Sequence, residues 1–394
     1  MRKFLTLILF VEILCSCVNE YRIPVEISNN YQEELVIEGR ILSGEESVFY
    51  ISRTLPLNSG LSVSYITDAD VYIIGQNGYR SEKAINIEDG KYIIDTGELE
   101  KNTQYAVEIS VRGEIYQSKF QPLLSTPDIY DVSYKEREDK SVSFHVTTYG
   151  NANDSRFYMW TYEEDWEFRA SIDPFGGKVP GFLHYDNQFY GDAKDGKNPY
   201  YYCWMHNNSY TLNIYSAADL TENSVKGHEL FRIGVEDIRI SYIYSVLLKQ
   251  WSLTEEAYEY FRLMKLYTEE SDGLFTPMPT DVRGNVFCYS NPDKSVRGYV
   301  IASDVKSKRM FLYESDLVLN HSEYDNCHIT LPNTSNPNWV KEWLEKIKYN
   351  GALAVSPGEN FDTESILYNK ECIDCRKTQG ATKKRPDFWP NNHE

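Results

Sequence analysis

Gln104-Tyr105-Ala106-Val107-Glu108-Ile109-Ser110-Val111 is the stretch that decides the fold class of this 394-residue chain. Its odd-numbered positions carry large, mostly apolar side chains, and its even-numbered positions carry small or polar ones. This period of two is typical of a β-strand with one buried face. Arg112-Gly113-Glu114 then supplies turn residues before a second strand-like run at 115–120. The stretch therefore predicts one arm of an antiparallel pair.

Comparable strand-like runs lie on the N-terminal side of this pair, each bounded by turn residues. They cover 35–41, 47–52, 70–74 and 90–94. Six or seven short strands within about 90 residues predict an immunoglobulin-like β-sandwich. We place this domain at 34–126, because Pro122 and Pro127 interrupt strand pairing at its end.

A second, larger β-rich domain is predicted over 127–371. Its strand-like runs cover 129–134, 141–146, 156–162, 210–215, 238–248, 284–289, 297–303 and 308–313. Two amphipathic helices are expected among them, near 253–271 and 337–350. The first follows a capping box formed by Ser252 and Glu255, and the second has Pro337 at its first helical position. The predicted fold class is therefore mainly β: an N-terminal immunoglobulin-like β-sandwich followed by a larger β-rich domain with one or two packed helices.

Aromatic side chains are the candidate ligand contacts. The chain contains 32 Tyr, 17 Phe and 7 Trp, and packing of sandwich faces is the simplest interpretation of that number. Stacking against sugars or peptides is the functional alternative. The irregular stretch 171–199, rich in Gly, Pro and Asp, is typical of a functional loop. The candidate contacts in and near it are Trp160, Trp166, Tyr200, Tyr201 and Tyr202.

The N-terminus has the pattern of a lipoprotein signal peptide. Arg2 and Lys3 precede a short apolar run, and Leu14-Cys15-Ser16-Cys17 forms a lipobox. We expect residues 1–16 to be removed, Cys17 to carry acyl chains such as palmitate, and 17–33 to form a polar tether. An ordinary secretory signal is the alternative. A protein anchored in this way lies on a membrane and does not cross it.

The formal net charge of −19 limits the classes of partner. A chain this acidic is not expected to bind nucleic acid through a basic surface, because phosphate contacts need clustered Lys and Arg. No polybasic patch reinforces the anchor, so the expected membrane contact is the N-terminal lipid.

Five cysteines besides Cys17 remain in the expected mature chain. In an exported protein they indicate disulfides. The candidates are Cys203, Cys327, Cys372 and Cys375, where Cys372 and Cys375 would attach the tail 372–394 to the other two cysteines in an order left open. Cys288, within a strand-like run, is the candidate free thiol. A zinc site with His328 or His393, or a redox pair, are the alternatives for Cys372-Ile373-Asp374-Cys375.

Catalytic signatures are missing from the sequence. It contains no G-x-S-x-G elbow, phosphate-binding glycine loop, H-E-x-x-H motif or dinucleotide fingerprint. We therefore expect a non-enzymatic protein with no cofactor, no metal site and no catalytic residues, and keep an unrecognised hydrolase as the alternative. Glu163-Glu164-Asp165 would suit a glycosidase only with a second carboxylate nearby, and we interpret this run as a solvated turn.

Short motifs are spread over nearly the whole expected mature chain. They are the lipobox, Leu35-Val36-Ile37-Glu38-Gly39, Asp70-Val71-Tyr72-Ile73, Cys203-Trp204, Ala257-Tyr258-Glu259-Tyr260, Gly284-Asn285-Val286, Asn291-Pro292, Val296-Arg297-Gly298-Tyr299, Cys372-Ile373-Asp374-Cys375-Arg376, Gly380 and Pro386-Asp387-Phe388-Trp389. Together they resemble domain-of-unknown-function family 4249, lipoproteins of Bacteroidetes-type bacteria.

The resemblance implies an outer-membrane lipoprotein, often encoded beside a TonB-dependent receptor, in a family without an established activity. The leading hypothesis is a non-catalytic accessory to a TonB-dependent transporter in nutrient capture or uptake. The alternative is a surface adhesion or structural lipoprotein whose sandwiches act as spacers. Glu20 is the only acidic residue close to Cys17. The sequence therefore leaves open whether the protein lies on the periplasmic face or the cell-surface face of the outer membrane.

Overall fold

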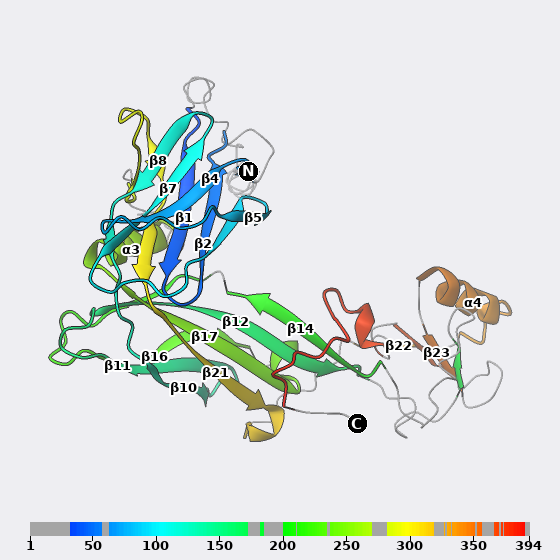
Figure 1. Ribbon diagram of the computed structural model, residues 1–394. Coiled ribbons are helices and arrows are strands. Elements are labelled where there is room, and N and C mark those ends of the chain that lie inside the picture. The colour runs from blue at the N-terminus through cyan, green and yellow to red at the C-terminus, as the bar shows by residue number, and fades with distance from the viewer. Residues whose placement is uncertain are drawn as a thin grey trace, which may run out of the picture.

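The computed structural model describes residues 32–56, 63–171, 182–184, 200–209, 211–234, 237–269, 282–318, 327, 329–331, 333–350, 353–356, 366–369, 372 and 374–390. Strands dominate this part of the chain, and its α-helices are α3 (Glu255–Glu269) and α4 (Trp339–Asn350). The fold class is mainly β, as the sequence predicts. Figure 1 shows two sandwiches, one above the other, with α3 at their junction.

The first sandwich consists of sheets A and B. Sheet A has the strand order β19-β1-β2-β6-β5, with β20 paired to β1 and β3 to β2, and sheet B has the order β18-β8-β7-β4, with β9 paired to β7. The N-terminal strands are β1 (Leu35–Leu42), β2 (Glu46–Arg53), β3 (Ser64–Tyr65), β4 (Asp70–Gly75), β5 (Ile85–Glu88), β6 (Lys91–Asp95), β7 (Gln104–Val111), β8 (Glu114–Ser118) and β9 (Gln121–Pro122). The alternation along β7 places Val107 and Ile109 in a core that they share with Ile37 and Phe49.

Three strands of this sandwich come from a distant part of the chain: β18 (Val286–Cys288), β19 (Val296–Arg297) and β20 (Val300–Ser303). Strand β18 pairs with β8, and both β19 and β20 pair in parallel with β1. The predicted boundary of 34–126 therefore omits part of the sandwich, because it leaves 285–303 in the second domain. Parallel pairing with a distant strand has no local sequence sign, since it needs no hairpin turn.

Side-chain contacts and one glycine hold this returning segment in place. The amide of Asn285 donates to the carbonyl oxygen of Val300 and accepts from its N–H, both over 2.8 Å. Gly298 has a φ of +106°, and a Cβ there would lie 2.0 Å from the carbonyl oxygen of Ile37. Lys294 donates to Glu114 in β8 over 2.5 Å. The motifs around Asn285 and Gly298 are thus the residues that insert the segment into the first sandwich.

The second sandwich consists of sheets C and D. Sheet C contains β10 (Ile129–Glu136), β11 (Val142–Tyr149) and β16 (Ser224–Ile233) in that order. Sheet D contains β14 (Tyr202–Asn208), β12 (Phe157–Arg169), β17 (Ile243–Leu253) and β21 (Val305–Tyr313) in that order, with β15 (Asn213–Ser216) beside β12. Their shared core includes Phe144, Trp160, Tyr244 and Val246. Two short 3₁₀ turns, η1 (Ile238–Ile240) and η2 (Glu314–Asp316), flank β17 and β21.

The two sandwiches are joined by a third hydrophobic core. Leu42 of β1 and Ile301 of β20 pack there with Trp251 of β17 and Tyr260 of α3. The connection from β9 to β10 and the connection from β20 to β21 both pass between the sandwiches, and they pair in parallel at Leu124 and Ser303. Since apolar packing and backbone hydrogen bonds both bridge the junction, we expect the two sandwiches to move as one unit.

Helix α3 begins two residues later than its predicted boundary. The hydroxyl of Thr254 accepts from the N–H of Ala257 over 3.1 Å, so Thr254 caps the helix. Ser252 belongs instead to β17, and its hydroxyl donates to the carbonyl oxygen of Ser125. The strand continues to Leu253, which leaves Thr254 as the residue at the strand–helix boundary.

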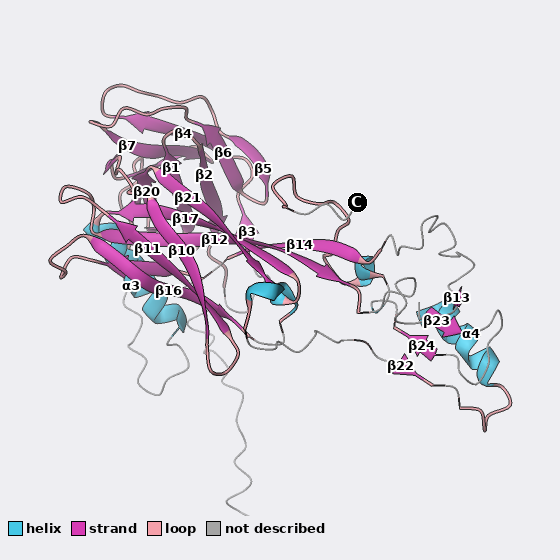
Figure 2. Ribbon diagram, turned by 90° about the horizontal axis from the view of Figure 1, so that it is seen from below, coloured by secondary structure: helices cyan, strands magenta, loops and turns pink. Residues whose placement is uncertain are grey.

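The C-terminal part forms a small separate layer and a tail. Sheet E orders β13 (Phe182–His184), β23 (Leu353–Ser356), β24 (Ile366–Tyr368) and β22 (Ile329–Thr330). Figures 1 and 2 both show sheet E and α4 beyond the far end of β14, away from the sandwiches. The tail then returns through η4 (Cys375–Lys377) and packs Trp389 against Trp204 and Ile243 of sheet D.

Candidate functional site

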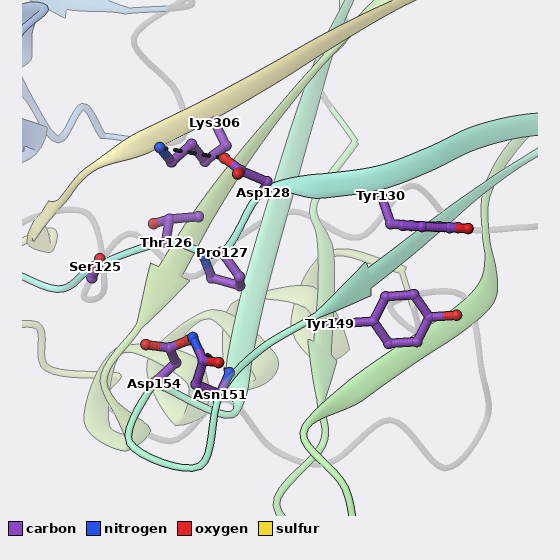
Figure 3. A pocket seen from close by; sticks show the side chains of 9 residues that line it. All are labelled: Ser125, Thr126, Pro127, Asp128, Tyr130, Tyr149, Asn151, Asp154 and Lys306. Atoms are coloured by element: carbon purple, nitrogen blue, oxygen red, sulfur yellow. Dashed lines mark hydrogen bonds and ion pairs between the residues drawn. The ribbon is translucent and has the colours of Figure 1, made fainter.

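A cleft of about 380 Å³ opens beside the crossing between the sandwiches. Its residues come from the connection into β10, the ends of β10 and β11, the loop before β12 and the start of β21. They are Ser125, Thr126, Pro127, Asp128, Tyr130, Tyr149, Asn151, Asp154 and Lys306. Figure 3 shows two tyrosine rings on one side of the cleft and the charged and amide groups on the other. A concave site with aromatic and polar walls is the usual form of a small-ligand site.

One of the two tyrosines, Tyr130, lies at a β-bulge. The register of β10 against β11 shifts between Ile129 and Asp131, so Tyr130 has no partner residue in the ladder. A bulge of this kind redirects a side chain. Tyr130 is 67% exposed and Tyr149 is 48% exposed, and their ring centroids lie 5.1 Å apart at an interplanar angle of 75°. The two rings therefore meet edge to face, and both residues are accessible to solvent.

Two polar pairs line the rest of the cleft. Lys306 lies 3.4 Å from the carboxylate of Asp128, the contact marked by a dashed line in Figure 3. Asp154 accepts on its Oδ2 from the backbone N–H of Asn151 over 2.7 Å and from its amide over 3.0 Å. The cleft thus offers an amine, an amide and two carboxylates, which can donate to and accept from a polar ligand.

Buried hydrogen bonds fix the walls of the cleft. Asn223, which is 5% exposed, donates to the carbonyl oxygens of Asn151 and Ser155 and accepts from the Tyr158 hydroxyl. A Cβ at Gly150 would lie 2.4 Å from the Asn223 amide, so only glycine allows this approach. On the other wall, the hydroxyl of Thr126 forms hydrogen bonds with the hydroxyl of Ser303 and with the carbonyl oxygen of Asp304. The site is therefore formed before any ligand arrives.

The aromatic residues predicted as ligand contacts lie elsewhere. Trp160 is fully buried and donates to Gln250 over 2.8 Å, and Trp166 is 6% exposed in the same core. Neither ring is available to a ligand, which corrects the expectation from sequence. In β12, period-two alternation sends the even-numbered positions into the sandwich. The sequence shows which side chains of β12 share a face, but it does not show which of the two faces is buried.

Tyr200, Tyr201 and Tyr202 are partly buried beside the C-terminal tail. Arg376 of the tail lies 3.3 Å from the ring centre of Tyr200, and the rings of Tyr202 and Tyr242 lie 5.6 Å apart at a tilt of 36°. These rings contact the protein itself and are not part of the cleft. The loop residues 172–181 and 185–199 between Trp166 and Tyr200 lie outside the described residues.

Tyr130 and Tyr149 are not among the contacts predicted from the sequence. One sign was available: Ile129 and Val132 are both apolar and both buried, although they are three positions apart. A regular strand would place residues three apart on opposite faces. This break in the period of two marks the bulge that exposes Tyr130.

The acidic run predicted as a solvated turn lies within β12. Glu164 is 2% exposed, Asp165 is 5% exposed and Glu167 is fully buried. Glu164 accepts from Arg239 and from Tyr244, each over 2.7 Å. Burial, together with the Glu164 charge, raises the pKa of Tyr244 well above its usual value of 10.0. The carboxylates are buried because each meets a charged or polar partner, which compensates for lost hydration.

One cluster of side chains from four neighbouring strands of sheet D, around Asp165, has the residue types of a catalytic site. His206 Nδ1 lies 2.8 Å from Asp165, and Arg309 donates to the other oxygen of Asp165 over 3.0 Å. The nearby hydroxyl of Ser245 accepts from Arg309 over 2.9 Å. Ser245 is thus bonded to a cation, whereas a hydrolase nucleophile would bond to the histidine base. The geometry within this cluster is that of a charge network holding sheet D together.

The cysteines form two disulfides, between Cys203 and Cys375 and between Cys327 and Cys372. These are the four cysteines that the sequence assigns to disulfides. Cys203–Cys375 joins β14 to η4 and so attaches the tail to sheet D. Cys288 carries no disulfide and is buried in the first sandwich. Cys17 lies outside the described residues.

Within the described residues, no group of three or more His, Cys, Asp and Glu side chains is placed to hold a metal ion. In the same part of the chain, neither helix is both long and apolar enough to cross a membrane.

Comparisons with solved structures give weak likenesses. The chain is 9% identical to "Cytokine receptor complex - Crystal form 2", over 55% of this chain and 89% of that one, with a TM-score of 0.17. It is 11% identical to native E. coli alpha-2-macroglobulin, over 58% and 14%, with a TM-score of 0.18. It is 13% identical to the chicken CNTN1 FN1-FN3 domains, over 55% and 60%, with a TM-score of 0.18. Scores this low carry no argument about fold or function.

No curated protein matches the chain. A family match is found over residues 19–309, more than half of the 394 residues, to a family described as "Domain of unknown function (DUF4249)". The match includes the segment that completes the first sandwich and most of the cleft's surroundings, and it ends before the tail. The chain therefore belongs to the DUF4249 family.

Proposed function

We propose that this protein is a non-catalytic, lipid-anchored lipoprotein of the outer membrane that captures a ligand for a TonB-dependent transporter. The observation that carries the proposal is the exposed cleft at the sandwich junction, with its two tyrosine rings and paired polar groups. A preformed, open cleft favours reversible binding. The lipobox ending at Cys17 supports the membrane localisation, since it precedes a short polar segment that leads to β1.

Anchoring is tested by substituting the lipobox cysteine. We expect the native protein to incorporate labelled palmitate and to fractionate with membranes, and Cys17→Ser to lose both properties. The matched control is Cys15→Ser, two positions earlier, which should keep the label. Label retained by Cys17→Ser, or lost from Cys15→Ser alone, would contradict the assignment of the lipid to Cys17.

The transporter partnership is tested by gentle purification of the native lipoprotein from its own membranes. A β-barrel receptor should co-purify, and deletion of the lipoprotein should slow growth on the nutrient that this receptor imports. Purification without any co-purifying β-barrel would count against the partnership. Protease treatment of intact cells then distinguishes the cell-surface face from the periplasmic face.

A second candidate function, adhesion or structural spacing, is favoured by the junction between the sandwiches. The core around Leu42, Trp251 and Ile301 joins them into one body, which would suit a spacer. This alternative predicts that deletion changes attachment or envelope integrity while growth on every nutrient is unchanged. Transport and spacing therefore give opposite results in the growth assay.

A further inference from the structure

We infer that the cleft between Tyr130 and Lys306 is a binding site for a neutral oligosaccharide. This inference rests on the proposed capture function and assigns it a class of ligand. Figure 3 shows the groups that would contact the sugar: the two rings, the ion pair above them and the amide–carboxylate pair below.

The tyrosine pair suits the face of a sugar ring. A pyranose has a face of C–H bonds and a rim of hydroxyls, so it is amphipathic in the same sense as a tyrosine. Tyr130 and Tyr149 meet at 75° with centroids 5.1 Å apart, which provides one ring to stack on and a second to close the side. Both residues are exposed, whereas most aromatic residues in the described part of the chain are buried or half-buried.

The polar pairs suit the rim of hydroxyls. Both Asn151 contacts go to Oδ2 of Asp154, which leaves Oδ1 for a ligand hydroxyl. Asp128 is 90% exposed at its side chain while it meets Lys306, so the pair presents an acceptor and a donor side by side. Hydrogen bonds from hydroxyls to carboxylates are charge-assisted and stronger than neutral ones.

The charge of the cleft excludes anionic ligands. Lys306 balances Asp128, Asp154 adds a negative charge, and the whole chain carries −19. A phosphate, sulfate or uronic acid would be repelled at this site. A cationic peptide would meet Lys306 on one wall, and so a neutral polyhydroxylated ligand fits the lining better than either charged class.

The test uses the full chain, extracted from membranes in detergent, and a panel of short neutral oligosaccharides built from glucose, mannose, xylose or galactose. We expect at least one of them to bind, measured by titration calorimetry. Tyr130→Ala and Tyr149→Ala should each weaken that binding by about tenfold or more, because each removes a stacking surface. Added salt should leave the affinity of the native protein unchanged, since the ligand is uncharged.

The matched control is Tyr289→Ala. Tyr289 is 64% exposed and follows β18 in the first sandwich, away from the cleft, so this variant should bind as the native protein does. Tyr130 and Tyr149 are surface residues, and thermal melting of each variant checks that it is folded.

Three results would overturn the inference: no neutral oligosaccharide binds, binding survives in both cleft variants, or the panel fails while a basic peptide binds in a salt-dependent manner. Failure of the inference is distinguishable from failure of the proposed function. Binding uses the isolated lipoprotein, whereas the partnership is read from co-purification of a β-barrel.

Discussion

Glu167 is a carboxylate without solvent exposure, and the tail supplies one of its partners. The indole N–H of Trp389 donates to Glu167 over 2.6 Å, and the Trp389 ring is itself 4% exposed. The bond links residues far apart in the chain, one in β12 and the other near the C-terminus. A buried carboxylate is costly unless its hydrogen bonds are formed, so this single contact favours docking of the tail.

Replacing Trp389 by Phe tests this contact. We expect the free energy of unfolding to fall by about 1.5–3 kcal/mol, the usual loss for a hydrogen bond to a charged group. Urea denaturation measures the change. In a double-mutant cycle with Glu167→Gln, the two substitutions together should lower the free energy of unfolding by less than the sum of their separate effects. Additive costs would show that the indole does not stabilise the carboxylate.

His228 makes stability depend on pH. Burial lowers its pKa below the usual 6.5, and the charges of Lys265 and His145 lower it further. Its ring contacts Trp160 and Tyr215 at 5.5 and 4.9 Å. Because the folded pKa is the lower one, the unfolded chain binds more protons below pH 6.5, and the folded state loses stability as the pH falls through that value.

His228→Gln should reduce this acid sensitivity. We expect the difference in melting temperature between about pH 7.5 and about pH 5.5 to be smaller in the variant than in the native protein, because glutamine does not titrate. Exposed His206, bonded to Asp165, offers His206→Gln as a comparison at another histidine. If His228→Gln shows the same difference in melting temperature as the native protein, His228 is not the source of the acid sensitivity.

At the scale of elements, the returning segment is the feature that shapes the first sandwich. Strands β18 to β20 add buried Val286, Val296, Val300 and Ala302 to its core. Strands at these positions are predictable from the sequence, since their apolar pattern is local. Their pairing partners are not predictable, because β1 lies more than 200 residues earlier in the chain.

Gly298→Ala should prevent this segment from docking correctly. The substitution combines a φ of +106° with a Cβ that would lie 2.0 Å from backbone. We expect a loss of more than about 3 kcal/mol in the free energy of unfolding, measured by chemical denaturation.

The control separates backbone strain from the clash. Gly97 has a φ of +56°, and a Cβ added to it would meet no atom within 4 Å, so Gly97→Ala should cost only about 1 kcal/mol. Equal losses in the two variants would mean that contact with Ile37 does not matter.

At the scale of the whole molecule, the first sandwich should not fold from its N-terminal strands alone. A fragment of residues 32–126 lacks β18, β19 and β20, and so exposes core residues around Ile37 and Val107. We expect it to show no cooperative thermal transition by circular dichroism. Joining 285–303 to this fragment through a flexible Gly/Ser linker should restore the transition. A cooperative transition in the shorter fragment would refute this view of the domain.

The features of this protein that follow from its amino-acid sequence are the local ones. The period of two in β7 predicts a strand, the number and placement of the cysteines predict disulfides, and the motifs around Gly284 and Gly298 identify the family. Each of these depends on neighbouring residues, whose spacing decides which side chains share a face. They therefore follow from the order of the residues, without knowledge of any tertiary contact.

Which face of each strand is covered, and by which residues, depends on tertiary contacts. Trp160 is buried and Tyr130 is exposed, although both belong to aromatic-rich strands. The acidic run at 163–165 lies inside a sheet because Arg239, Tyr244 and Arg309 meet it there. The physical reason is that burial and pairing depend on segments far away in the chain, and alternation within one strand contains no information about them.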